Sequence, residues 1–213
     1  MGLQIFESSG SFDPAARGLT AGDTLDVVLV GGGSSGEFYI RETNEQPIVS
    51  PRVAGTESTM GGLSSANGVR MGVGGAGNQS SSPYAGCGAG GYMPGVPMYG
   101  GNGGTNSRAG SGLAGTVLAS ASPWANPSGG GNKGARGFAD VPAGHGYGAG
   151  GAGQGGGLHD MIYPASGGDA GKIAFGSITL ANTNVISVTV GGGGVNAQSG
   201  TVSGAPGVVL VFW

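Results

Sequence analysis

The chain has 213 residues, of which 53 are glycine, and only 9% of its residues are charged. Glycine has no side chain to bury and loses the most backbone entropy on folding, so this composition argues against an ordinary enzyme core. The net charge is −3, and residues 58–139 carry four cations and no acid, which is too sparse for a surface that follows nucleic-acid phosphates.

The first predicted strands lie in the N-terminal block, residues 1–57. A turn precedes the apolar residues 25–30, which predict a strand that runs into three consecutive glycines. Residues 37–41 predict a second, short strand. Residues 46–52 contain two prolines, and proline within a sheet is confined to edges, so an edge strand or a loop is expected there.

Most of the glycine lies in the middle block, residues 58–170, where glycine pairs separate islands of Tyr, Met, Pro and Trp such as residues 92–99 and 122–127. Gly or Pro interrupts every window that could form a helix. Glycine is not placed strictly at every third position, which excludes collagen. The spacing fits either a bundle of extended polyglycine II helices, packed backbone against backbone, or structured loops, and both alternatives stay open.

The C-terminal block, residues 171–213, carries the clearest strand signals. Residues 172–180 and 185–190 predict strands on either side of a turn, and the second alternates apolar with polar side chains. The chain closes on a continuous apolar run that would aggregate if it were exposed, so we expect it at the centre of a sheet.

Together these patterns predict a mainly β fold with almost no α-helix. The N- and C-terminal strands are expected to pair into a small β-sandwich or sheet, which carries the glycine-rich middle block. The three blocks, residues 1–57, 58–170 and 171–213, are then parts of one integrated domain.

Motifs with catalytic chemistry are weak in this chain. Three G-x-G-x-x-G matches lack the preceding strand and following helix that a dinucleotide site needs, and no phosphate-binding P-loop occurs. His145 and His159 have neither a G-x-S-x-G serine nor the spacing of metal ligands, and Cys87 has no His or Lys near it in sequence. The sequence therefore predicts no catalytic residue, no cofactor, no metal site and no enzyme.

Aromatic and Met side chains on the Gly/Pro-rich segments are the candidate contact residues. Tyr and Trp on Ser/Gly-rich loops are typical of binding surfaces, where they supply rigid contact area. Such residues also pack loops against a core, and both roles stay open. The candidates are Tyr92, Met93, Met98, Tyr99, Trp124, Tyr147 and Tyr163.

Targeting signals are absent from the sequence. The first residues lack the cationic and apolar regions of a signal peptide, and no apolar run approaches the roughly 20 residues of a membrane span. We expect a protein made in a cytosol, which would reach the outside by lysis or within an assembly.

Four stretches of the sequence resemble the glycine-rich adhesin tips of bacteriophage tail fibres: LTAGDTLDVVLVGGG, STMGGLSSANG followed by GVGGAG, VISVTVGGGG and the closing GVVLVFW. The resemblance covers both ends and one internal segment, and the acidic stretch EFYIRETNEQ departs from it. It implies a virion protein, made in the host bacterial cytoplasm, in which glycine segments form a scaffold and the islands between them bind a host-surface protein or glycan.

The resemblance further implies a tip subunit mounted on another fibre or baseplate protein, either as a homo-oligomer such as a trimer or as a monomer on a trimeric fibre. No nucleic-acid partner and no membrane insertion are expected. The alternative is a purely structural virion cap or spike that binds no receptor. An ice-binding bundle would need regularly recurring Thr or Ala, which the middle block lacks.

Overall fold

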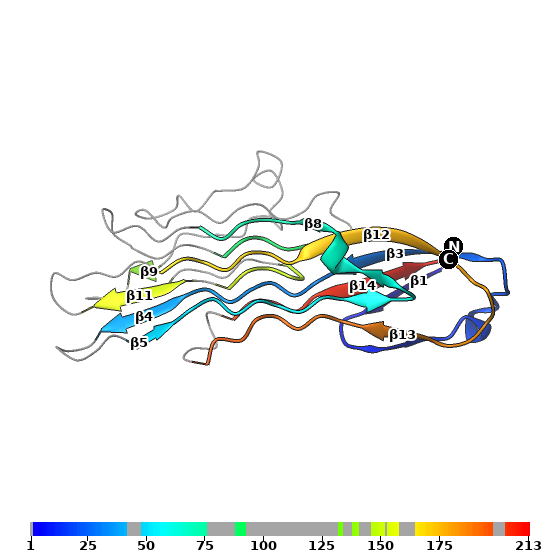
Figure 1. Cartoon of the computed structure of the whole chain (residues 1–213), viewed down its shortest axis with the longest axis horizontal. Coiled ribbons are helices and arrows are strands. Elements are labelled where there is room, and N and C mark those ends of the chain that lie inside the picture. Colours follow the sequence, from blue (N-terminus) through cyan, green and yellow to red (C-terminus); the bar gives the residue numbers. More distant parts are fainter. Residues whose placement is uncertain are drawn as a thin grey trace.

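The computed structural model describes residues 2–41, 48–75, 88–92, 132–133, 138–140, 146–151, 153–157, 165–197 and 203–213. These residues form an elongated molecule with a two-sheet sandwich at one end and a third sheet at the other (Figure 1). Both termini lie at the sandwich end. The described helices are two short 3₁₀ turns, η1 (Ala15–Arg17) and η2 (Ser65–Asn67), which confirms the prediction of a mainly β fold with almost no α-helix.

The first sheet of the sandwich is antiparallel, with the strand order β1-β14-β3-β12-β8. Its strands are β1 (Leu3–Phe6), β14 (Val208–Phe212), β3 (Thr24–Val30), β12 (Lys172–Thr179) and β8 (Val69–Arg70). The closing apolar strand β14 lies between β1 and β3, as its sequence predicts. N- and C-terminal strands therefore build this sheet together.

The second sheet of the sandwich has the order β2-β13-β6-β7. Its strands are β2 (Gly10–Phe12), β13 (Ile186–Thr189), β6 (Thr59–Met60) and β7 (Leu63–Ser64). The predicted turn at residues 181–184 carries the chain from β12 in the first sheet to β13 in the second. Gly61 and Gly62, with φ of 54° and 85°, make the turn between β6 and β7, a backbone conformation that glycine adopts without strain.

The sandwich core lies between these two sheets. Phe12 and Met60 of the second sheet pack with Leu29 and Val209 of the first, and each is at most 1% exposed. Trp213 covers the end of this core, because its ring stands edge-on to Phe12 at 5.3 Å between centroids. The backbones of Gly2 and Trp213 exchange hydrogen bonds of 2.6 and 3.1 Å, so the two ends of the chain are tied together.

The third sheet lies at the end of the molecule away from the termini (Figure 1). It has the order β5-β4-β11-β10-β9, with β4 and β11 parallel. Its strands are β5 (Ile48–Ser50), β4 (Phe38–Arg41), β11 (Gln154–Gly157), β10 (Phe138–Asp140) and β9 (Asn132–Lys133). The segment with two prolines supplies an edge strand, β5, as expected.

Extended segments run side by side between the sandwich and the third sheet (Figure 1), and we call them the glycine bundle. Its segments are residues 31–37, 51–57, 71–75, 88–91, 148–151, 165–171, 191–196 and 203–207. Their backbones bond to one another across the bundle rather than within one segment. Lateral bonding of this kind satisfies buried N–H and C=O groups with few side chains.

The hydrogen bonds of residues 31–37 follow a three-residue repeat. The first, fourth and seventh N–H groups donate to the antiparallel segment that leads into β12: Gly31 to Lys172, Ser34 to Asp169 and Glu37 to Ser166, each at 2.9 Å. The second and fifth N–H groups bond to residues 53–56, and the third bonds to Ala205 at 3.0 Å. One segment therefore has three lateral donor directions, whereas a β-strand has two.

The same repeat occurs in two neighbouring segments. In residues 165–171, Gly167 and Ala170 donate to residues 72–75, and Gly168 and Gly171 donate to residues 148–151. In residues 203–207, Gly204 and Gly207, three positions apart, both donate to residues 191–194. A three-residue repeat with lateral bonding is the geometry of a polyglycine II bundle. Of the two alternatives that the sequence left open, the described segments therefore form the bundle and not structured loops.

The bundle segments lie in direct backbone contact because their glycines have no Cβ atom. A methyl group added at Gly150 would overlap the carbonyl of Gly168, and one added at Gly194 would overlap the carbonyl of Val53. Close Cα–H···O=C approach of this kind recurs between laterally packed backbones. The glycine content of the sequence is therefore explained by backbone-to-backbone contact.

Buried serines join the sandwich to the glycine bundle. The Ser58 hydroxyl donates to the carbonyl of Val30, at the end of β3, and accepts from the N–H of Gly191, at the start of a bundle segment, at 2.6 and 2.8 Å. Ser58 and Ser65 exchange two further hydrogen bonds of 2.9 Å each. Both residues belong to the stretch STMGGLSSANG, so this stretch connects the two parts of the molecule.

Candidate functional site

Two of the candidate contact residues, Tyr92 and Tyr147, form an isolated antiparallel bridge with two backbone hydrogen bonds of 2.8 Å. Both side chains are half-buried, and they pack against a second apolar cluster on the outer face of the first sheet, which includes Val208 and Leu210. The structure therefore brings these two tyrosines together over the sheet.

The Tyr147 hydroxyl donates a hydrogen bond to the carboxylate of Glu7, which follows β1. This bond raises the pKa of Tyr147 above 10.0, because ionising the phenol would break it, and burial and repulsion from Glu7 act in the same direction. Tyr147 thus fixes residues 146–151 to the first sheet as well as offering a partly exposed ring.

The other candidates, Met93, Met98, Tyr99, Trp124 and Tyr163, lie outside the described residues, as do Cys87, His145 and His159. The structure therefore does not bear on their positions. They remain predictions from the sequence.

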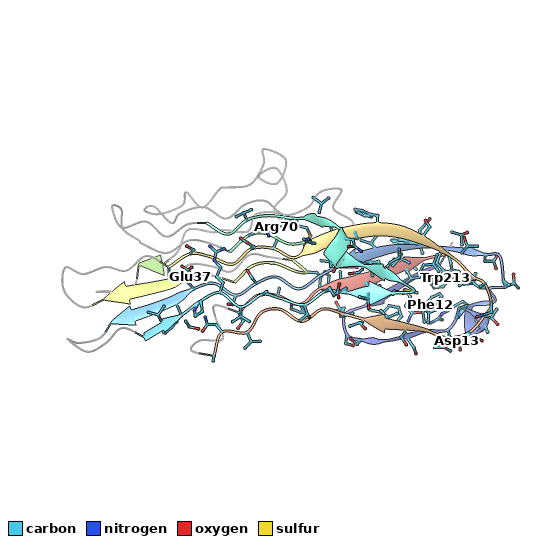
Figure 2. The ribbon with its side chains drawn as sticks, in the orientation of Figure 1. Phe12, Asp13, Glu37, Arg70 and Trp213 are labelled. Atoms are coloured by element: carbon cyan, nitrogen blue, oxygen red, sulfur yellow. The ribbon has the colours of Figure 1, made fainter. Side chains whose placement is uncertain are left out.

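A charge cluster that the sequence did not indicate lies on the glycine bundle, with Asp169 at its centre. The Asp169 carboxylate accepts from Arg52 at 3.2 Å, from Arg70 at 3.0 Å and from the backbone N–H of Gly74 at 2.8 Å. Glu37 lies 4.0 Å from the Nε of Arg52, a buried nitrogen with no hydrogen-bond partner. Figure 2 shows Glu37 and Arg70 along the bundle, away from Trp213 at the sandwich end.

The cluster connects four bundle segments that are far apart in sequence. Arg52 and Arg70 stand 117 and 99 positions from Asp169, so no local motif could have revealed the pairs. The side chains are 24–51% exposed, and ion pairs at that exposure stabilise a fold by about 1 kcal/mol or less. The ion pairs therefore add little to stability, although they join segments that are far apart in the sequence.

An open cleft of about 300 Å³ lies where the glycine bundle meets the sandwich. Its lining combines glycine backbone with the side chains of Glu57, Arg70, Asp169 and Lys172. Lys172 donates to the carbonyl of Ala66 at 2.8 Å, and Glu57 accepts from Ser64. The lining residues include no His, Cys or aromatic side chain, and the cleft offers polar contacts from hydroxyls, carboxylates and two cations.

In the part of the chain that the structure describes, no group of three or more His, Cys, Asp or Glu side chains could hold a metal ion. None of the helices described there has the length and the apolar character needed to cross a membrane.

Comparison with known proteins finds no family model, no curated protein and no solved structure that matches this chain.

Proposed function

We propose that the chain is a tip protein of a bacteriophage tail fibre or baseplate, which binds a protein or glycan on the surface of the host cell. The observation that carries this proposal is the polyglycine II bundle, which extends away from the sandwich that holds both termini (Figure 1). A bundle built from backbone needs few apolar side chains. Aromatic residues of the glycine-rich block are therefore available for contact with a target.

The placement of the ends also supports the proposal. An attachment to a fibre at the sandwich end, where Gly2 and Trp213 are tied together, leaves the opposite end exposed. The third sheet lies at that opposite end, where β4 stops at Arg41 and β5 starts at Ile48. Binding residues are commonly held at the ends of strands that a scaffold positions.

The proposed contact residues are Met93, Met98, Tyr99, Trp124 and Tyr163, together with the exposed sides of Tyr92 and Tyr147. Aromatic side chains bind both protein surfaces and sugar rings with little loss of entropy. Two carboxylates line the cleft, and both already have partners: Glu57 accepts from Ser64, and Asp169 is held by two arginines.

The test replaces residues 93–99 with a Gly/Ser segment of equal length and keeps Tyr92, because Tyr92 bridges to Tyr147. Labelled protein is then bound to a panel of bacterial cells. We expect wild type to bind at least one strain and the variant to lose at least about 90% of that binding, since a few aromatic anchors dominate most interfaces.

The control replaces residues 181–184, an exposed turn at the sandwich end, with Gly/Ser. This variant should bind as wild type does. Equal binding by the 93–99 variant would contradict the assignment of that island, and failure of wild type to bind any strain would favour a structural cap or spike instead.

A further inference from the structure

Among the strands that the structure describes, β1 is an open edge of the first sheet. The outermost hydrogen bonds to β14 join Gly2 and Trp213, and paired residues of antiparallel strands alternate between bonded and non-bonded positions. Leu3 and Ile5, which face Phe212 and Leu210, therefore occupy non-bonded positions. Their N–H and C=O groups point away from β14, outward from the sheet.

The side chains of the same two residues are exposed and apolar. Leu3 is 51% and Ile5 is 44% exposed. Natural edge strands are usually protected by Lys, Pro, a bulge or a very short length. β1 has the sequence LQIF and none of these features, whereas the opposite edge strand, β8, has two residues and ends in Arg70.

We propose that β1 is the interface between two copies of this chain, which pair antiparallel around a two-fold axis at Gln4. This pairing places Leu3 of one copy opposite Ile5 of the other, in the bonded positions that the open edge supplies. Each Leu–Ile pair exchanges two backbone hydrogen bonds, so the two copies share four. The two first sheets then continue as a single sheet.

The pattern of β1 favours a second copy over an unrelated strand. Leu3 and Ile5 lie symmetrically about Gln4, so the open edge is complementary to itself, as a two-fold interface requires. Cross-strand pairs of apolar side chains stabilise a sheet, and like charges placed opposite one another destabilise it. β1 itself carries no charge, and the cation beside it, Arg17, donates to the Gln4 side chain at 3.0 Å.

The edge lies on the sandwich, away from the third sheet (Figure 1). A pair joined through β1 therefore leaves the third-sheet end of each copy free, whereas Tyr147, which bonds to Glu7 directly after β1, lies beside the interface. The inference itself rests on strand register and exposure alone, so it stands or fails separately from the proposed function.

The experiment measures the mass of the purified protein in solution by light scattering over a series of concentrations. We expect wild type to approach twice the 20.3 kDa of one chain. Ile5→Lys, which places a charge on each side of the interface, should keep the mass of one chain. The control Val185→Lys changes a residue that is 58% exposed outside β1 and should still pair.

A second variant tests the register and does not depend on the behaviour of Ile5→Lys. Gln4→Cys places two thiols across the two-fold axis in a non-bonded pair, where Cβ atoms are close enough for a disulfide. Mild oxidation should link this variant to itself, while Ser8→Cys, in the exposed turn after β1, and wild type, with Cys87 alone, stay unlinked.

Either of two results would overturn the proposal. One is a wild-type mass of a single chain at every concentration that stays in solution. The other is a larger species that Ile5→Lys leaves intact or that Gln4→Cys does not link.

Discussion

Individual glycines in the bundle are under a steric constraint that ordinary surface glycines do not have. At Gly150, Gly168 and Gly194 the atom that a Cβ would strike is a backbone carbonyl, which cannot move aside as the tip of a flexible side chain can. Gly192 lies in the same segment as Gly194, but its nearest neighbour would be the Thr56 hydroxyl at 3.8 Å, an ordinary contact. Gly194 therefore has no room for a side chain, whereas Gly192, two positions earlier, has room for a methyl group.

Gly194→Ala should therefore lower the free energy of unfolding by about 3 kcal/mol or more, at the upper end of the cost of overpacking. Gly192→Ala should leave stability unchanged or raise it by up to about 1 kcal/mol, because alanine reduces the freedom of the unfolded chain. Urea unfolding followed by circular dichroism measures both. Equal losses in the two variants would contradict the close packing of the bundle.

Among the elements, those with alternating or continuous apolar residues could be predicted from the sequence. β3, β12, β13 and β14 lie where the pattern places them, since burial of one or both faces fixes which residues are apolar. β11 could not be predicted, because Gln154–Gly157 reads QGGG and has no side-chain signal for a strand. Its pairing with β4 and β10 is set by neighbouring backbones.

The candidate site was less predictable than the strands, because it too depends on contacts between backbones that leave no side-chain pattern in the sequence. The charge cluster around Asp169 depends on which glycine segments become neighbours, and a backbone bundle leaves no periodic side-chain record of that order in the sequence. The aromatic islands were visible as composition, but their composition did not reveal that Tyr92 and Tyr147 share a bridge over the first sheet.

The contact between Tyr147 and Glu7, which connects a bundle segment to the end of β1, predicts a pH dependence. The pKa of Tyr147 is higher in the folded protein than in the unfolded chain, so its contribution is complete below pH 10 and is lost as pH rises through the folded value. Tyr147→Phe should cost at most about 1 kcal/mol at neutral pH, the net value of one exposed hydrogen bond.

The free energy of unfolding of wild type and Tyr147→Phe, measured from pH 7 to about pH 11, should converge at the alkaline end, where tyrosine ionises. Glu7→Ala removes both the hydrogen bond and the charge that hold the phenol protonated, and absorbance at alkaline pH should then show one tyrosine titrating earlier. A constant difference between wild type and Tyr147→Phe across this range would contradict the assignment.

In the whole molecule, the sandwich and the glycine bundle depend on one another. The first sheet continues into the bundle through β3, β12 and β14, each of which is joined directly to a bundle segment. The fully buried Ser58 bonds to both parts, to Val30 in the sandwich and to Gly191 in the bundle, so separating the parts would break both hydrogen bonds. Each such bond contributes about 0.5–1.5 kcal/mol net, which favours cooperative unfolding of the two parts.

A change deep in the bundle should therefore lower the stability of the sandwich. In a Trp124→Phe background, the fluorescence of Trp213 reports on the sandwich, because this ring packs against Phe12. Gly150→Ala, placed in the bundle, should move the Trp213 transition to lower urea concentration and keep it coincident with the transition seen by circular dichroism. Gly192→Ala in the same background should move neither, and a Trp213 transition that stays in place while the bundle melts would show that the two parts fold independently.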